Sequence, residues 1–200
     1  MVQKKAQTSV AIHDIIARRW SPRAFDKSKP VSRGQVMALL EAARWAPSCY
    51  GDEPWRYLVW DRYRDPGPWQ KAFECLSEGN QAWVQNAPLL LASVAASQFV
   101  HNGNPNRWGQ HDTGAASANL VLQAVALGLA AHQMGGFDVD MLRERFAIPA
   151  GFTPMAMIAV GYQADVAILE RNFKERELAA RTRRPIGEKF FEGAWGVPVA

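Results

Sequence analysis

Cysteine is scarce in this sequence: its 200 residues include only Cys49 and Cys75. Two cysteines without ligand-type spacing provide neither a disulfide framework nor a metal cluster, a pattern typical of a reducing cytoplasm. Histidine is also scarce, and His101 and His111, which share one loop, have no third ligand at a suitable spacing. We therefore predict a cytoplasmic protein without a bound metal.

Long hydrophobic runs are missing as well. The longest apolar stretch of small residues, 114–131, contains Ser117, Asn119 and Gln123, so it is better explained as a buried or interface helix than as a membrane span. The first residues lead into an amphipathic segment instead of an apolar signal core. We predict neither membrane insertion nor export.

Charge is not concentrated in one sign. The net charge is +4 and the isoelectric point is near 9.3, but basic residues alternate with acidic ones without a basic and aromatic patch, which argues against nucleic-acid binding. The 12 prolines and 15 glycines are spread along the chain without repeats or low-complexity tracts. The length of 200 residues predicts a single domain, 1–200, with a sizeable core.

The segment from Ala46 to Trp55 joins a predicted helix to a predicted strand at 57–60. Ser32 and Gln35 form a capping box before an apolar run at helical spacing, and Pro47 ends this helix. Two prolines, a glycine and small polar residues then make a stiff loop whose backbone could approach a flat ligand. For this loop taken alone, an ordinary helix–strand connection is the simpler explanation.

A short predicted helix at 10–17 ends in a basic turn. Pro22 breaks the helix, so Arg19, Ser21 and Arg23 should converge there with free backbone N–H groups. Guanidinium groups together with a hydroxyl suit a phosphate monoester. For an isolated cluster, a solvated basic turn is the simpler alternative.

The middle of the chain alternates helices with buried strands. A helix is expected at 69–76, ended by the Gly79-Asn80-Gln81 segment. A longer helix is expected from Asp112, as its N-cap, to about Leu129, and its Gly and Ala content predicts a flat surface against another helix or a second subunit. Continuous apolar runs predict central strands at 89–95 and 154–162.

The C-terminal part holds two further features. Gly135-Gly136 is either a simple turn before a short helix near Asp138 or a place where backbone N–H groups face a ligand. A charged segment at 170–184 precedes the tail 186–200, which is too apolar to remain in solvent. We expect this tail to dock as a strand or an arm on a partner chain.

Taken in this order, these segments resemble the FMN-dependent nitroreductase family. The motifs that carry the resemblance are R-x-S-x-R-x-F at 19–25, A-x-W-A-P-S…P-W at 43–55, Asn80 before Ala87-Pro88, a Gly/Ala-rich helix with Asn119-Leu120, the Gly136-Phe137 pair, and R-x-R-x-P at 181–185. Each motif is weak alone, but the ordered set covers almost the whole chain.

The resemblance implies an α+β sandwich in which a mixed, largely antiparallel sheet of four or five strands is flanked by helices. It further implies a domain-swapped homodimer with FMN at the interface and residues 181–200 as an exchanged C-terminal arm. The residues implied to hold the FMN phosphate are Arg19, Ser21, Arg23, Arg181 and Arg183. The residues implied near the flavin ring are Pro47, Ser48 and Cys49 from the other subunit, Asn80 on the pyrimidine side, and the backbone N–H groups of Gly135 and Gly136 facing N5 and O4. Trp20 and Gly51 complete the implied cofactor-binding set.

The activity implied by the resemblance is oxidoreduction. NADH or NADPH would pass hydride to flavin N5, and an electron-poor acceptor such as a nitroaromatic or a quinone would then be reduced in a ping-pong scheme. No catalytic side chain is assigned. The alternatives are a non-catalytic FMN-binding or sensing protein, another flavin reaction on the same fold, and an α/β binding domain without flavin.

Four positions depart from the family pattern. Gly51 and Glu53 stand where the family commonly has Asn and Gln, and Glu53 could pair with Arg56. Trp83 stands where some relatives carry a lysine near the ring, and Trp20 is usual only in part of the family. The cofactor assignment survives these departures, whereas substrate and nucleotide preference stay open.

Overall fold

The centre of the fold is strand β2 (Leu89–Ala96), in which every side chain is buried. The computed structural model describes residues 2–199. Within them, β2 lies in a four-stranded sheet of order β1-β2-β4-β3, and all three pairings are antiparallel. The other strands are β1 (Trp55–Asp61), β4 (Phe152–Gly161) and β3 (Ala130–Met134). The predicted α+β class, with a largely antiparallel sheet, is confirmed.

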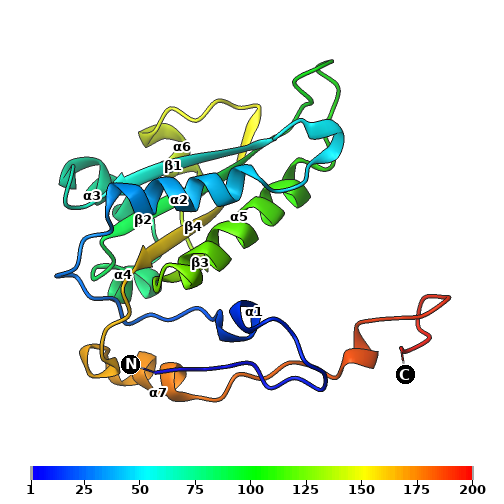
Figure 1. Cartoon of the computed structure of the whole chain (residues 1–200). Coiled ribbons are helices and arrows are strands. Elements are labelled where there is room, and N and C mark those ends of the chain that lie inside the picture. Colours follow the sequence, from blue (N-terminus) through cyan, green and yellow to red (C-terminus); the bar gives the residue numbers. More distant parts are fainter. Residues whose placement is uncertain (1, 200) are drawn as a thin grey trace.

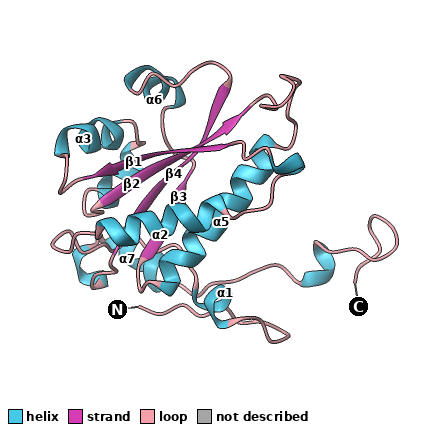
Figure 2. Ribbon diagram, turned by 45° about the horizontal axis from the view of Figure 1, so that its top comes forward, coloured by secondary structure: helices cyan, strands magenta, loops and turns pink. Residues whose placement is uncertain are grey.

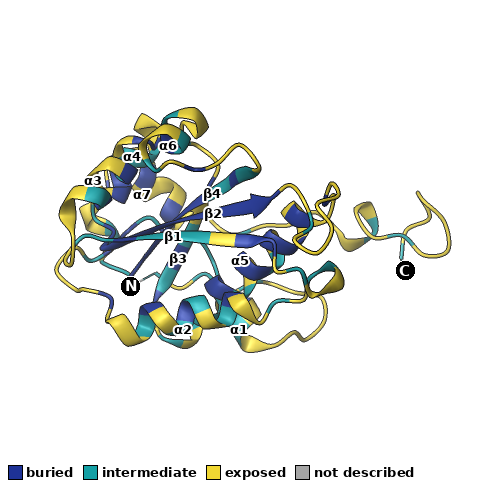
Figure 3. Cartoon of the chain, turned by 90° about the horizontal axis from the view of Figure 1, so that it is seen from above, coloured by how far each residue is buried: buried dark blue, intermediate teal, exposed yellow. Residues whose placement is uncertain are grey.

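Alternation along β2 divides the core between the two faces of the sheet. Leu89 and Leu91 belong to one cluster of buried side chains, and Leu90 and Ala92 belong to the other. Helices cover both faces, as Figures 2 and 3 show. The first face is covered by α2 (Arg33–Arg44) and α5 (Gly109–Ala126). The second is covered by α3 (Pro66–Glu74), α4 (Glu78–Val84), α6 (Val139–Arg145) and α7 (Arg171–Leu178).

Local sequence signals fix several of these elements. Ser32 caps α2 through the predicted capping box, in which Ser32 Oγ accepts from Gln35 N and Gln35 Oε1 accepts from Ser32 N. Asp138 is the N-cap of α6, as its position before the short helix suggested. None of the helices within residues 2–199 combines the length and the hydropathy needed to cross a membrane.

Several sequence predictions of helix and strand limits are wrong. The helix expected at 10–17 spans only Asp14–Arg18. Gly79-Asn80-Gln81 does not end a helix: it lies in the first turn of α4, and the break falls before Ser77, the α4 N-cap. Asp112 is not an N-cap, because α5 begins at Gly109 and leaves Asp112 inside its first turn. Strand β3 was not predicted, since its short Ala, His and Gln sequence lacks β-branched residues and depends on pairing with β4.

The two ends of the chain lie side by side under the sheet. The N-terminal segment runs along α7 and the residues after it, below α1 (Asp14–Arg18) (Figure 1). Gln163 Nε2 donates to the Val2 carbonyl, and Lys4 Nζ donates to the Arg176 carbonyl. Beyond residue 180 the chain leaves the body as an extended arm with a short 3-10 turn at Ile186–Glu188 (Figure 1).

Candidate functional site

The basic turn after α1 presents Arg19 and Ser21 on the same side. Arg19 follows the last helical residue and has extended backbone angles, φ −61° and ψ 123°. Arg19 Nη1 donates to Ser21 Oγ over 3.3 Å. Because side chains alternate along an extended segment, Trp20 and Pro22 point away from this pair.

Arg181 and Arg183 join Arg19 in a cluster of like charges. Burial lowers the pKa of Arg19, and the neighbouring charges of Arg181 and Arg183 lower it further. Arg181 Nη1 is held by the carbonyls of Lys4 and Ala17, at 2.7 and 3.2 Å. Within residues 2–199, none of these three guanidinium groups has an acidic partner within 4.0 Å. The cluster therefore suits an anionic ligand, as the sequence predicted for a phosphate.

Arg23 differs from the other predicted phosphate ligands. Its guanidinium faces Glu177, with 3.9 Å between Nη1 and Oε2, and lies over the Trp83 ring at 6.0 Å from the centroid. Burial lowers the pKa of Arg23, and the Glu177 carboxylate opposes this effect. Arg23 thus stands beside the cluster with a carboxylate already facing it.

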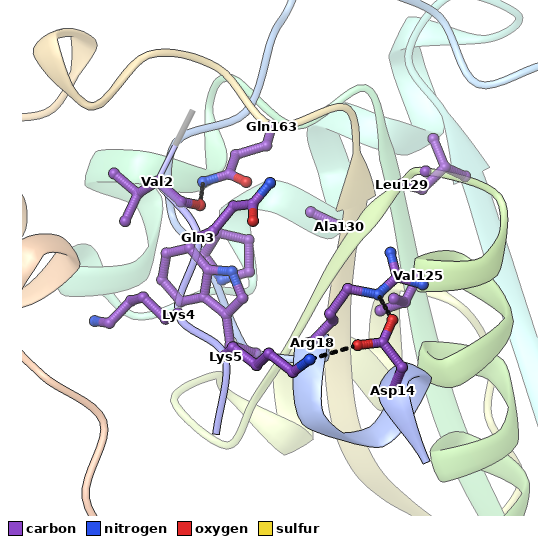
Figure 4. A pocket seen from close by; sticks show the side chains of 13 residues that line it. Val2, Gln3, Lys4, Lys5, Asp14, Arg18, Val125, Leu129, Ala130 and Gln163 are labelled. Carbon is purple, nitrogen blue, oxygen red and sulfur yellow. Dashed lines mark hydrogen bonds and ion pairs between the residues drawn. The ribbon is translucent and has the colours of Figure 1, made fainter. Parts of the chain in front are cut away.

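Trp20 lies on the opposite face of the turn, against the N-terminal segment. With Pro22 it lines a cavity of about 360 Å³ between this segment, β3 and the end of α5 (Figure 4). The Lys4 ammonium is 4.9 Å from the centre of the Trp20 ring. Arg19 and Ser21 do not line this cavity. Trp20 therefore packs on the side of the turn opposite Arg19 and Ser21.

A second polar centre lies at the far end of β3, at Gly135 and Gly136. The Gly136 carbonyl accepts from Asn80 Nδ2 at 2.9 Å and from Ser77 N at 3.0 Å. A Cβ at Gly136 would come within 2.7 Å of Asn80 Nδ2 and 2.8 Å of Ser77 Oγ, so any larger residue here would have to displace these two side chains. In the described chain, the N–H groups of Gly135 and Gly136 donate to no protein group. Two adjacent free N–H groups can bind an electronegative edge of a ligand.

Strand β3 connects the two centres. It is an edge strand, and His132 within it binds the basic turn, with 3.0 Å between Nδ1 and the Pro22 carbonyl oxygen. Gly135 follows directly after the last residue of β3. His132 stands three residues before Gly135, so at about 3.3 Å per residue the contact with the basic turn and the glycine pair lie roughly 10 Å apart along the chain. An extended ligand with a phosphate at one end and a polar ring at the other fits this arrangement.

His132 is a neutral, half-buried link between β3 and the basic turn. Burial lowers the pKa of His132 to about 4, and the nearby Arg23 and Arg19 charges act in the same direction. Its ring packs on Trp83, with centroids 4.6 Å apart, and Trp83 stacks on Phe25 on its other side. Trp83, only 1% exposed, is therefore a core residue at the position where some relatives carry a lysine.

We expect His132 to make the protein less stable in acid. An unfolded histidine titrates near pH 6.5, whereas the folded imidazole resists protonation down to about pH 4. Between pH 6.5 and pH 4, His132 is protonated in the unfolded chain but not in the folded chain. The free energy of unfolding therefore falls by about 3 kcal/mol over this interval. Urea unfolding should show a shallower fall for His132→Asn, which keeps a donor near Pro22 without titrating. Parallel curves for the variant and the wild type would contradict the assignment.

The loop at 47–53 lies at the other end of the molecule, beside the start of α5 and far from the basic turn (Figure 1). Cys49 N donates to Asp112 Oδ2 at 2.9 Å, and Ser48 Oγ accepts from Glu53 N at 3.1 Å. Asp52 Oδ1 accepts from Val100 N at 2.9 Å. These bonds fix the 47–53 loop to α5 and to the loop that follows β2. The 47–53 loop contains a turn of 3-10 helix at Cys49–Gly51.

The structure thus brings the predicted site residues together in three groups. One group is the basic turn with Arg181 and Arg183, and a second is Asn80 with Gly135 and Gly136. The third group consists of Pro47, Ser48, Cys49 and Gly51, which a single chain keeps apart from the other two (Figure 1). The suggested pairing of the Glu53 carboxylate with Arg56 is not found among the described residues: Arg56 Nη1 donates to the backbone carbonyls of Glu53 and Trp55 instead, at 3.0 and 2.8 Å.

Sequence reasoning assigned no site role to three polar residues: His132 and Glu177 at the basic turn, and Asp112, expected only as an N-cap, at the 47–53 loop. Asp112 and Glu177 are buried carboxylates, 4% and 0% exposed. A signal existed for Glu177, since it stands four residues after Phe173 and so shares the buried face of α7. His132 gave no local signal, because its partners Pro22 and Trp83 come from distant parts of the chain.

Comparison with known proteins gives consistent matches. The sequence profile described as "Nitroreductase family" matches residues 16–162. An "Uncharacterized 15.4 kDa protein in ask 5'region" of Mycolicibacterium smegmatis is 39% identical over 93 residues, a match that spans 46% of this chain and 63% of that protein. A Methanothermobacter thermautotrophicus protein, provisionally named NADH dehydrogenase/NAD(P)H nitroreductase, is 30% identical over 156 residues, covering 76% of this chain and 77% of that protein.

A solved structure shows the same fold over the whole chain. It is described as "The crystal structure of the oxidoreductase containing FMN" and is 35% identical to this chain. It superposes with a TM-score of 0.91, covering 98% of this chain and 100% of that one.

Proposed function

Because this chain belongs to the nitroreductase family, we propose that it is an FMN-dependent oxidoreductase that uses NADH or NADPH to reduce electron-poor acceptors such as nitroaromatics or quinones. The observation that carries the proposal is the cluster of Arg19, Arg181 and Arg183 beside β3, which has no acidic partner among residues 2–199. Gly135 and Gly136 follow the last residue of β3, and within the described chain their N–H groups donate to no protein group. FMN combines a phosphate and a flat polar ring in one molecule.

The residues present fit this cofactor. Arg19, Ser21, Arg181 and Arg183 would hold the phosphate, since three guanidinium groups and a hydroxyl can supply several charge-assisted hydrogen bonds. Asn80, Gly135 and Gly136 would hold the ring. When bound, FMN supplies the hydride-transfer chemistry.

The chain's own part in the reaction is positioning and electrostatics. The N–H groups of Gly135 and Gly136 would stabilise negative charge on a bound flavin ring. Asn80 holds their turn in place through the Gly136 carbonyl. We assign no catalytic acid or base, because hydride transfer requires no proton transfer from a side chain.

We also propose that the working unit is a homodimer. The loop with Pro47, Ser48 and Cys49 is rigid but distant from the basic turn of its own chain, so it would serve the site of a second copy (Figure 1). Residues 1–200 would form one FMN-binding domain, with 181–200 as an arm on the partner. The exposure of Trp195, 92%, supports this role for the arm. Because both cysteines are unpaired, a reducing compartment such as the cytoplasm suits the protein.

The visible spectrum of the purified protein tests this function. We expect flavin absorption bands that bleach on anaerobic addition of NADH or NADPH and return when a nitroaromatic or a quinone is added. Titrating each nucleotide separately gives the preference between them. Bands that neither nucleotide bleaches would contradict the reductase assignment, and a colourless protein that takes up no added FMN would contradict cofactor binding itself.

A further inference from the structure

The proposed site contains one buried acid whose place in a basic region needs explanation. Glu177 lies in the last turn of α7, is 0% exposed, and shares the buried face of this short helix with Phe173. Taking a carboxylate out of water is costly unless it is paired and hydrogen-bonded. The partners of Glu177 therefore indicate what it does.

Those partners all belong to the basic turn or its neighbours. Glu177 Oε1 accepts from the backbone N–H of Arg23 at 2.8 Å and from that of Ala24 at 3.3 Å. Glu177 Oε2 makes no hydrogen bond in the described chain and lies 3.9 Å from Arg23 Nη1. The Lys4 ammonium is close enough for the Glu177 charge to raise its pKa against the larger lowering effect of burial.

The contacts of Glu177 join two segments that both carry phosphate-binding candidates. The turn supplies Arg19 and Ser21, and the chain that leaves α7 supplies Arg181, four residues after Glu177. Arg181 in turn binds the Ala17 carbonyl, just before the turn. The carboxylate and this guanidinium thus hold the same two segments together at two points.

We propose that Glu177 is the positioning residue of the phosphate site, fixing the backbone at Arg23 and Ala24 so that Arg19, Ser21 and Arg181 converge on one anion. This role rests on the proposed binding of FMN. Glu177 is too deeply buried to meet the ligand, and its negative charge would repel a phosphate. Its effect passes through the turn that it holds.

The test compares Glu177→Ala with Glu177→Gln and with the control Glu175→Ala. Glu175 stands on the same helix but is exposed, and its carboxylate pairs with Arg171 at 3.1 Å. Full-length flavin-free protein is titrated with FMN and with riboflavin, which lacks the phosphate, and the quenching of flavin fluorescence gives each Kd. Amide hydrogen exchange is measured for the peptide that contains Arg23 and Ala24.

We expect Glu177→Ala to weaken FMN binding about tenfold, the effect of losing hydrogen bonds to a charged acceptor, and riboflavin binding by no more than about twofold. Exchange at Arg23 and Ala24 should be faster without flavin. Glu177→Gln keeps an acceptor oxygen and should stay within about threefold of wild type, and Glu175→Ala should match wild type. If Glu177→Ala fails to fold, Glu177→Asp replaces it, because it withdraws the acceptor by one methylene with the same expected selective loss.

Equal weakening of FMN and riboflavin, or unchanged FMN affinity, would overturn the role of Glu177 while leaving the proposed function in place. A wild-type protein that binds neither flavin would overturn the proposed function, and the role of Glu177 with it. Slow exchange at Arg23 and Ala24 in Glu177→Ala would also overturn the role, whatever the flavin affinity.

Discussion

Replacement of Arg19 by alanine is expected to weaken FMN binding about 100-fold, the largest functional effect of any single change proposed for this chain. Arg19 is half-buried and lies in the cluster with Arg181 and Arg183, and its partner Ser21 is too weak a ligand to replace it. A charge-assisted hydrogen bond to phosphate is about twice as strong as a neutral one, and here it acts partly shielded from water. The measurement is the Kd of FMN by fluorescence quenching.

Riboflavin and a second arginine provide the controls for this experiment. Riboflavin binding should fall far less than FMN binding, because the lost contact is to the phosphate. Arg64→Ala removes the same charge from an exposed position between β1 and α3 and should leave the FMN affinity unchanged. Equal affinity for FMN in the wild type and Arg19→Ala would show that the phosphate lies elsewhere.

Replacement of Gly109 by alanine is expected to give the largest loss of stability. A Cβ at Gly109 would lie 2.3 Å from the carbonyl oxygen of Ala96, the last residue of β2. Ala96 cannot retreat easily, since its N–H donates to the Pro54 carbonyl at 2.8 Å. Helix α5 must then shift from the sheet, which we expect to cost about 3 kcal/mol, or roughly 6–12 °C in melting temperature.

Gly34→Ala is the matched control for this loss, measured by thermal and urea unfolding. Gly34 lies in helix α2, and an added Cβ there would meet only Ser32 Oγ at an ordinary 3.9 Å. Alanine favours the helix over glycine by up to about 1 kcal/mol, so this variant should be as stable as wild type or more stable. A Gly109→Ala protein with wild-type stability would mean that α5 does not approach β2 as closely as described.

The predictable parts of the fold are those specified by neighbouring residues. The Ser32 and Gln35 capping box was found in the sequence because both hydrogen bonds close within three residues. The continuous apolar run of β2 marks a strand buried on both faces. Strand β3 lacks such a signal, because Ala131 and Gln133 have little strand preference and form a strand only through β4.

In the candidate site, too, the features specified by neighbouring residues were predictable and those that depend on distant residues were not. The clustering of Arg19, Ser21 and Arg23 within five residues made the basic turn visible in the sequence. The acids that organise the site were not visible, because Glu177 meets Arg23 across 154 positions of sequence and Asp112 meets Cys49 across 63. Such long-range contacts decide whether an arginine faces a carboxylate. They make Arg23, which faces Glu177, differ from Arg19, which has no carboxylate within 4.0 Å in the described chain.

The contact of Arg181 with the Lys4 carbonyl closes almost the whole chain into a loop, since it joins positions 177 residues apart. Chain ends are where local unfolding and proteolysis usually begin. Fraying of either end would therefore release Arg181 and empty the phosphate site while the sheet stays intact. A ligand held by Arg181 would in turn keep both ends from fraying, so occupancy of the site and protection of the termini would rise and fall together.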